Sequence, residues 1–324
     1  MIDRRAFLAG IGGFIATPLA AEAQPNKVFK IGFLRGAGTG RAFNAFREAL
    51  NQHGYMEGRR VTYQVGLAGS DNVQFPALAR DLIGARVDII VAASTPAALA
   101  AKSVTASIPV VFFGVGDPIG TGLVLSLARP GGNVTGVSQA TSEGLPGKRL
   151  EILKELAPKA SRVAVIGVAT NQTNRVAVAS LETATKALRM TMQSLGVNTA
   201  DDITAAFSVI RERRADSLSV LPDVLTFGEL QRIIDFAAEN RLPAVYAFRE
   251  FVEAGGLISY GIDLLAASRT AASLVVKVLN GARVSELPVE QATKYETVIN
   301  LKTAKALGLT IPPSLLLRAD QVLE

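Results

Sequence analysis

Short apolar stretches alternate with longer amphipathic segments along most of this chain. Residues 28–34, 61–67, 88–93 and 109–115 have the length and the β-branched content of buried strands. Between them, residues 42–52 and 75–83 carry apolar side chains at spacings of three and four, as on one face of a helix. Because parallel strands need a long connection and a helix supplies one, this alternation predicts a parallel sheet covered by helices.

The same alternation starts again after the turn Pro130-Gly131-Gly132-Asn133. The pattern predicts strands at residues 134–138, 162–168, 217–221, 244–247, 256–259 and 295–300, and helices at 148–157, 175–195, 203–213, 227–240 and 264–279. Pro312-Pro313 predicts an extended segment near the C-terminus, because proline interrupts helices. The two arrays predict an α/β fold of two lobes with parallel sheets, joined by a hinge in the Gly-, Ser- and Thr-rich stretch 136–146.

The N-terminus carries the features of an export signal. Arg4 and Arg5 precede an apolar stretch at 6–21, which is shorter than the ~20 residues that span a bilayer. Small residues at 21–23 fit a cleavage site, so we expect residues 1–23 to be removed. The order Arg-Arg-x-Phe-Leu is similar to a twin-arginine signal, although a Sec signal shares these features. Both routes predict a periplasmic protein.

Composition narrows the possible chemistry. The 324 residues include no cysteine and one histidine, which excludes thiolate nucleophiles, disulfides, cysteine-bound metals and two-histidine metal sites. His53 follows a predicted helix directly before Gly54, as expected for a surface or capping residue. The net charge of +6 is not gathered into a basic stripe, so nucleic acid is not an expected partner. We therefore expect a binding protein without cofactor or metal, and not an enzyme.

Ligands of open parallel sheets bind beyond the carboxyl ends of the strands. The loops that follow the predicted strands contain Arg35, Ser94, Thr95, Asp117, Asn171, Asp223, Phe248 and Tyr260. Ser94-Thr95-Pro96 combines a hydroxyl N-cap with proline at a helix start, an arrangement that either only caps the helix or also receives a carboxylate. Asp117 and Asp223 are likewise either caps or partners for an ammonium group.

Two nucleotide-binding motifs are excluded by their spacing. Gly36-x-Gly38-x-Gly40 follows the first strand, but a dinucleotide fingerprint requires glycine where Arg41 stands. No acidic residue ends the second strand to hold a ribose. The segment 147–149 lacks the glycine and hydroxyl residues of a phosphate loop.

Long motifs spread over the body resemble one family. They include Gly54-Tyr55-x-Glu57-Gly58, Thr95-Pro96-Ala97-Ala98-Leu99-Ala100, Val115-Gly116-Asp117-Pro118-x-Gly120-Thr121-Gly122, Leu127-Ala128-Arg129-Pro130-Gly131-Gly132-Asn133-Val134-Thr135-Gly136, Gly147-Lys148-Arg149-Leu150-Glu151, Phe248-Arg249-Glu250-Phe251, Gly255-Gly256-Leu257-x-Ser259-Tyr260-Gly261 and Ile311-Pro312-Pro313. In these residues the chain resembles the substrate-binding proteins of ABC transporters, in the branch whose characterised members bind tryptophan or other aromatic amino acids.

This resemblance implies a type I periplasmic-binding fold of two Rossmann-like lobes with parallel sheets, joined by a hinge. It implies an N-terminal lobe of residues 24–140 and 262–290, and a C-terminal lobe of residues 141–261 and 291–324. It also implies capture of a small amino-acid-like or carboxylate-bearing ligand by hinge closure, followed by docking of the monomer on an inner-membrane ABC permease. A sensory module for a receptor kinase would look the same, whereas a Rossmann-type enzyme lacks its fingerprint and a repressor core lacks a DNA-binding helix-turn-helix.

The resemblance also implies roles for individual residues. Ser94 and Thr95 would contact a carboxylate, and Asp117 and Asp223 would contact an ammonium or other polar group. Tyr246, Phe248 and Tyr260 would line the apolar part of the site. Arg35 departs from the small residue that similar proteins carry in its loop, which implies a more acidic ligand.

Overall fold

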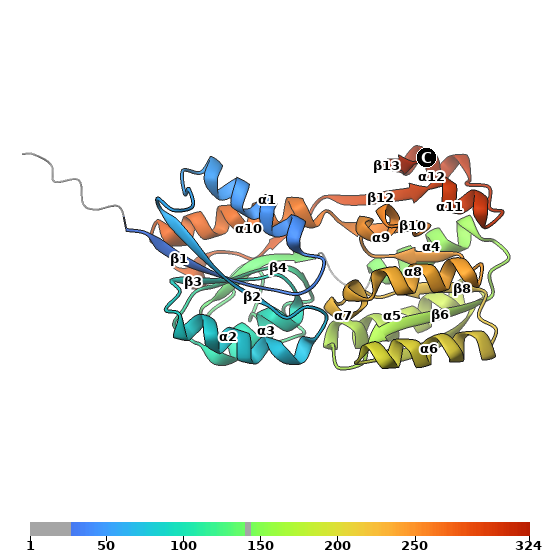
Figure 1. The fold of residues 1–324 in the computed structure, drawn as a ribbon, viewed down its shortest axis with the longest axis horizontal. Helices are drawn as coiled ribbons and strands as arrows, with labels where there is room; N and C mark the ends of the chain where they lie inside the picture. Colours follow the sequence, from blue (N-terminus) through green and yellow to red (C-terminus); the bar gives the residue numbers. More distant parts are fainter. Residues whose placement is uncertain (1–26, 140–143) are drawn as a thin grey trace, which may run out of the picture.

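Two lobes lie side by side, each built from one twisted sheet with helices on both of its faces (Figure 1). The computed structural model describes residues 27–139 and 144–324. The predicted export signal at 1–23 and residues 140–143 of the predicted hinge lie outside the described residues. The α/β fold with two Rossmann-like lobes is confirmed.

The sheet of the first lobe is parallel throughout, with strand order β11-β5-β4-β3-β1-β2. Its strands are β1 (Phe29–Arg35), β2 (Val61–Leu67), β3 (Ile89–Ala92), β4 (Val110–Gly116), β5 (Val134–Gln139) and β11 (Glu290–Gln291). The central strand β3 is buried on both faces, which explains its continuous apolar sequence.

Helices cover both faces of this sheet (Figure 1). The helices α1 (Gly40–Gln52) and α10 (Leu264–Leu279) pack on one face, and α2 (Phe75–Gly84) and α3 (Thr95–Val104) pack on the other. In α1 the buried residues are Ala42, Ala45, Phe46, Ala49 and Leu50, which recur at spacings of three and four. Short 3-10 turns, η1 (Asn72–Gln74) and η2 (Val284–Glu286), complete the lobe.

The sheet of the second lobe has the order β13-β12-β10-β9-β8-β6-β7. Its strands are β6 (Arg162–Val168), β7 (Thr191–Val197), β8 (Ser217–Val220), β9 (Ala244–Tyr246), β10 (Ile258–Ile262), β12 (Tyr295–Asn300) and β13 (Gln321–Leu323). The pairing of β10 with β12 is antiparallel, and the other pairs are parallel. Both predicted parallel sheets are therefore present, and the antiparallel strand β12 is an exception in the second.

The helices of this lobe pack around two apolar clusters, one on each face of the sheet. They are α4 (Gly144–Leu156), α5 (Gln172–Ala187), α6 (Ala200–Glu212), α7 (Val224–Gly228), α8 (Leu230–Glu239), α9 (Arg249–Glu253), α11 (Leu301–Ala306) and α12 (Pro313–Arg318). The chain leaves the first lobe after β5. It returns to the first lobe between β10 and α10, and it leaves again between β11 and β12. Several segments distant in sequence therefore join the two lobes.

Three predicted elements differ from the structure. The helix predicted at 175–195 ends at Ala187, and Arg189 then adopts a left-handed turn (φ 54°) that leads into the edge strand β7. The helix predicted at 227–240 is two helices, α7 and α8. The C-terminal segment is not wholly extended, because Pro313 begins the short helix α12, a position where its missing N–H costs nothing.

Within residues 27–139 and 144–324, no helix combines the length and the apolar character that crossing a membrane requires.

Candidate ligand-binding site

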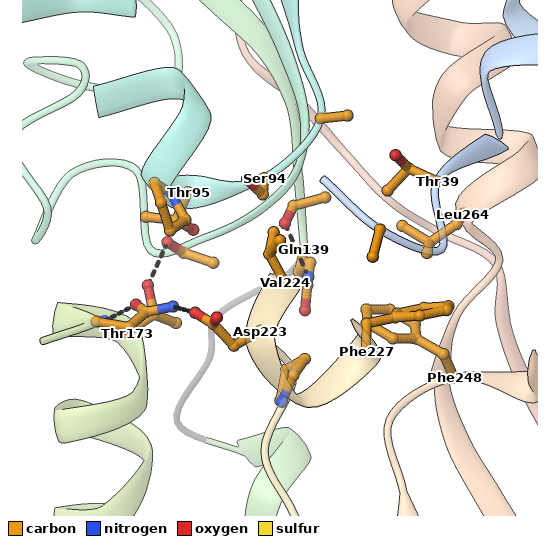
Figure 2. Close-up of a pocket in the computed structure, with 17 residues that line it drawn as sticks. Thr39, Ser94, Thr95, Gln139, Thr173, Asp223, Val224, Phe227, Phe248 and Leu264 are labelled. Carbon is orange, nitrogen blue, oxygen red and sulfur yellow. Dashed lines mark hydrogen bonds between the residues drawn. The ribbon is translucent and has the colours of Figure 1, made fainter. Parts of the chain in front are cut away.

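A cavity lies between the two lobes, where the carboxyl ends of the strands of both sheets meet (Figure 2). It encloses about 580 Å³, including space that is open to solvent. The lining residues are Ala37, Thr39, Ala93, Ser94, Thr95, Pro96, Gly114, Gly116, Gln139, Asn171, Thr173, Pro222, Asp223, Val224, Phe227, Phe248 and Leu264. Both lobes therefore contribute walls to one space.

Three helices begin at this cavity, and their N-cap residues line it. The Ser94 hydroxyl accepts a hydrogen bond from Ala97 N at 3.3 Å at the start of α3. Asn171 Oδ1 accepts one from Thr173 N at 2.9 Å at the start of α5, and Asp223 caps α7. Because helix N-termini carry partial positive charge, the starts of α3 and α5 favour an anionic group, although the described part of the lining contains no cation.

Thr95 is the side chain at the start of α3 that is best placed to bind a ligand. It is buried, with 5% of its surface exposed, and its hydroxyl lines the cavity (Figure 2). Pro96 follows it and has no N–H to compete for an acceptor. No group among the described residues forms a hydrogen bond with the Thr95 hydroxyl, so this hydroxyl is available to a ligand.

Asp223 is the charged residue of the described cavity lining, and it is only 8% exposed. Its Oδ1 accepts hydrogen bonds from Leu225 N at 2.9 Å and from Asn72 Nδ2 at 2.8 Å, and its Oδ2 accepts one from Asn171 Nδ2 at 2.7 Å. Burial raises the pKa of the Asp223 carboxyl above its usual range, and these three donors partly offset that effect. Since Asn72 belongs to the first lobe, the carboxylate also bridges the lobes.

An apolar wall stands opposite these polar groups. The rings of Phe227 and Phe248 lie with their centroids 5.8 Å apart, and Leu264 is the neighbouring aliphatic residue (Figure 2). The cavity thus offers hydrogen-bonding groups on one side and aromatic surface on the other.

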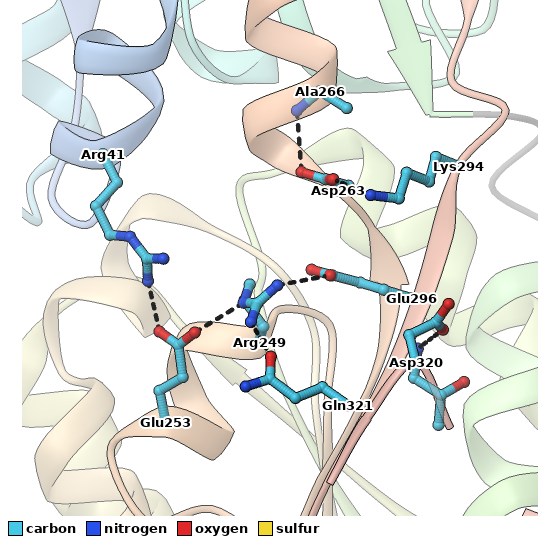
Figure 3. A network of polar contacts seen from close by, with 10 residues as sticks. Arg41, Arg249, Glu253, Asp263, Ala266, Lys294, Glu296, Asp320 and Gln321 are labelled. Atoms are coloured by element: carbon cyan, nitrogen blue, oxygen red, sulfur yellow. Dashed lines mark hydrogen bonds and ion pairs between the residues drawn. The ribbon is translucent and has the colours of Figure 1, made fainter. Parts of the chain in front are cut away.

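Further polar contacts connect the lobes around the cavity. Thr173 Oγ1 donates to Gly116 O at 3.3 Å, and Gln172 Nε2 donates to Gly120 O at 2.7 Å. Arg41 of α1 in the first lobe also forms an ion pair with Glu253 of α9 in the second (Figure 3). The two lobes are therefore in direct contact across the site.

Glu253 belongs to a larger network, which Figure 3 shows. Arg249 Nε donates to Glu253 Oε1 at 2.7 Å, and Arg249 Nη1 donates to Glu296 Oε2 at 2.9 Å. Arg249 also contacts Gln321. Burial raises the pKa of the Glu296 carboxyl, and the charge of Arg249 acts in the opposite direction. This network joins α9 to the strand β12, which enters the second lobe from the first.

Five of the residues predicted from the sequence lie together at the cavity: Ser94, Thr95, Asn171, Asp223 and Phe248. Each of them follows a strand at its carboxyl end, as the topological rule for parallel sheets requires.

Arg35 and Asp117 lie elsewhere. Along β1, Arg35 has the same parity as Ile31 and Phe33, so its side chain points toward α1 and its guanidinium carbon lies 6.0 Å from the centre of the Phe43 ring. Asp117 Oδ1 accepts a hydrogen bond from Gly120 N at 2.8 Å and so closes its own turn. Neither side chain lines the cavity, contrary to expectation.

Tyr246 and Tyr260 are also outside the cavity lining. Tyr246 is 1% exposed and its ring stacks on Phe251 at 4.7 Å in the core of the second lobe. Tyr260 stacks on Tyr295 at 6.1 Å and lines a separate hollow near α4 and α12. On both strands the side chain points to a sheet face, and not to the strand end where the cavity lies.

Sequence reasoning missed Val224, Phe227, Thr173 and Gln139 as lining residues. Val224 and Phe227 lie on the five-residue helix α7, which the predicted helix 227–240 did not separate from α8. A local signal for α7 exists, because Asp223 and Thr226 form a capping box in which Thr226 Oγ1 accepts from Asp223 N at 3.1 Å.

Comparison with known proteins agrees with this architecture. Residues 27–323 match the family described as ABC transporter substrate binding protein. A tyrosine-binding protein of Clostridioides difficile is 32% identical over 269 residues, which cover 83% of this chain and 77% of that protein.

Solved structures show the same arrangement of lobes. A Streptococcus pneumoniae ABC domain in complex with L-Trp superposes with a TM-score of 0.84 at 26% identity, covering 92% of this chain and 100% of that chain. The ligand-free, open structure of a substrate-binding protein with adhesive properties from Clostridium difficile superposes with a TM-score of 0.64 at 29% identity, covering 91% of this chain and 99% of that chain. These matches establish a type I periplasmic-binding fold, and they show a solute-binding protein that is not an enzyme. The chain belongs to the ABC transporter substrate-binding protein family.

Proposed function

We propose that this protein is the periplasmic receptor of an ABC uptake transporter and that it captures an amino acid with an apolar, preferably aromatic, side chain. The observation that carries this proposal is the composition of the cavity, in which free hydrogen-bonding groups, one buried carboxylate and an aromatic wall face one another. The relatives that bind tyrosine and L-Trp support the same class of ligand.

The polar side of the cavity suits the two charged groups of an amino acid. The ligand carboxylate would accept a hydrogen bond from the Thr95 hydroxyl, at the positive end of α3. The ammonium group would lie beside Asp223, whose Oδ2 accepts one hydrogen bond within the described protein and has further acceptor capacity. The side chain of the ligand would then contact Phe227 and Phe248.

The absence of a cation from the described lining argues against a second acidic group on the ligand. A further carboxylate buried beside Asp223 would have no positive partner, and burying an unpaired charge is costly. Since the Arg35 side chain points toward α1, it does not supply that partner. We therefore propose a neutral amino acid, and not the more acidic ligand that Arg35 first indicated.

Transport would follow from closure of the lobes. The ligand contacts both lobes, so it stabilises the closed arrangement by its differential affinity for that state. The closed monomer would then dock on an inner-membrane permease after export through the N-terminal signal.

A thermal-shift screen tests the ligand class. The screened compounds are L-tryptophan, L-tyrosine, L-phenylalanine, L-glutamate and tryptamine, each at about 1 mM. With a Kd of ~10 μM, mass action adds about 2.7 kcal/mol to the free energy of unfolding, which raises Tm by several degrees. We expect shifts with the aromatic amino acids, and none with L-glutamate or with tryptamine, which lacks the carboxylate. Equal shifts with tryptamine and L-tryptophan, or no shift with any amino acid, would refute the proposal.

A matched pair of variants tests the carboxylate contact. Thr95→Val removes the hydroxyl at nearly constant volume, whereas Thr62→Val makes the same change on β2, outside the cavity lining. A hydrogen bond to a charged group contributes about 1.5–3 kcal/mol, so isothermal titration should show a Kd raised roughly 10- to 150-fold in Thr95→Val only.

A further inference from the structure

The short helix α7 of the second lobe packs directly against a glycine turn of the first. An ideal Cβ built on Gly36 would lie 2.1 Å from Val224 Cγ1 and 2.7 Å from Val224 Cγ2. One built on Gly38 would lie 2.0 Å from two carbons of the Phe227 ring. Carbon atoms that are not bonded to each other normally lie about 3.5–4.0 Å apart. The contact between the lobes therefore has no room for a side chain at either glycine.

Burial shows that Val224 is enclosed at this contact. Val224 is only 4% exposed, and it joins the apolar cluster of the first lobe that contains Leu34 and Ala92. Val224 and Phe227 also line the cavity. The same two side chains therefore contact the ligand space and the opposite lobe.

Two more glycines have the same relation to the opposite lobe. A Cβ on Gly116 of the first lobe would lie 2.6 Å from Thr173 Cγ2 of the second. A Cβ on Gly228, at the end of α7, would lie 2.3 Å from Ser70 Cβ of the first lobe. At four positions of the interface, therefore, a glycine lets the opposite lobe approach the backbone closely.

We propose that the turn Gly36–Gly38 is the packing surface for α7. In this role Gly36 is a positioning residue, which allows the lobes to reach the closed arrangement that holds the ligand. The inference rests on the proposed function only in that closure serves ligand capture. A methyl group at position 36 would force α7 outward by more than an ångström. Such a shift would stretch the hydrogen bond between Asn72 of the first lobe and Asp223, the N-cap of α7, which now measures 2.8 Å.

The chain offers a clean test of this role. Gly36 is not among the residues with positive φ, so alanine fits its backbone, whereas Gly38 has φ 77° and would be strained by any side chain. Gly40 lies in the same segment, and the nearest atom to a Cβ built there is Arg35 Nη1 at 3.9 Å. Gly40→Ala is therefore the matched control for Gly36→Ala.

Closure can be measured without any ligand, because the chain has no cysteine and introduced cysteines are the only reactive thiols. Arg41→Cys and Glu253→Cys place one thiol on each lobe, at positions that form an ion pair in this structure. A short bismaleimide joins the two thiols only when the lobes are together, so the rate of cross-linking reports the closed population. The full chain is used in every variant, and circular dichroism verifies folding.

We expect Gly36→Ala to slow cross-linking at least about tenfold, and Gly40→Ala to leave the rate unchanged. In a Val224→Ala background, which removes both γ-carbons, Gly36→Ala should slow the reaction by less than about threefold. Equal rates for Gly36→Ala and Gly40→Ala would overturn the inference, as would an undiminished effect in the Val224→Ala background. If Gly36→Ala does not fold, Gly116→Ala with and without Thr173→Ala repeats the test at the second contact.

The two proposals fail separately. If the cross-linking rate depends on Gly36 but the protein binds no amino acid, the role of Gly36 is supported and the proposed ligand class is wrong. If the protein binds amino acids but the cross-linking rate does not depend on Gly36, the ligand class is supported and the role of Gly36 is wrong.

Discussion

Removal of the Asp223 carboxylate should produce two separable losses, because this group acts both within its own lobe and across the cleft. Within the lobe it caps α7 through Leu225 N at 2.9 Å. Across the cleft it accepts a hydrogen bond from Asn72 Nδ2 at 2.8 Å. The cap exists whether the lobes are open or closed, whereas the bond to Asn72 requires that they touch. Stability and affinity therefore report different contacts.

The magnitudes follow from these contacts. Loss of an N-cap costs about 1 kcal/mol, and Asp223→Ala also removes the hydrogen bond from Asn171 within the same lobe, so the free energy of unfolding of the ligand-free protein should fall by at least about 1 kcal/mol. A hydrogen bond to a charged acceptor contributes about 1.5–3 kcal/mol, so the same variant should raise Kd roughly 10- to 150-fold. Any direct contact of the carboxylate with the ligand adds to this loss.

Asn72→Ala isolates the contact across the cleft. It leaves the cap of α7 and the bond from Asn171 in place. Asn72 Oδ1 is buried without a partner among the described residues, so its removal offsets part of the loss. We expect Kd to rise by about fivefold, equivalent to ~1 kcal/mol, with stability unchanged.

Isothermal titration with L-tryptophan and urea unfolding of the ligand-free protein measure the two quantities. If Asp223→Ala lowers only the unfolding free energy, and both variants bind within about twofold of the unaltered protein, Asp223 is a helix cap alone and the bridge has no role in binding.

Three further outcomes are expected. Phe248→Ala should weaken binding by about 1–2 kcal/mol in titration, because the Phe248 ring lines the cavity. Tyr246→Phe should leave Kd unchanged because the Tyr246 ring lies in the core, and the opposite ranking would contradict the described site. Arg249→Met should lower the free energy of unfolding by about 2–3 kcal/mol at pH 7, because it leaves the buried carboxylate of Glu296 without its ion-pair partner, after allowance for the partial exposure of Arg249. Burial already raises the pKa of Glu296, so this penalty should shrink as pH falls and the carboxyl becomes protonated; a penalty independent of pH in urea titrations would refute the assignment. Burial also raises the pKa of Asp223, so its carboxylate becomes protonated at a pH at which an exposed aspartate is still ionised. Affinity should therefore fall as pH is lowered through the raised pKa, and Asp223→Asn should abolish this pH dependence in the titration series.

The fold class and part of the site followed from local sequence patterns. Alternating apolar runs and helix-period segments predict the parallel sheets because each element buries its own apolar face. The loops that follow the strands then identify Ser94, Thr95, Asn171 and Asp223, since the carboxyl ends of parallel strands meet at one edge. The edge strand β7 was missed because its mixed polar and apolar residues match no buried strand.

Side-chain direction and the packing of the lobes were decided only by the tertiary structure. Arg35 and Tyr246 lie near strand ends in sequence, but the alternation of side chains along a strand turns each toward a sheet face and away from the cavity. The contact between Gly36 and Val224 joins positions far apart in the chain. No local periodicity encodes such a pair, because the space available to each residue is set by the other lobe and exists only once both lobes have folded and met.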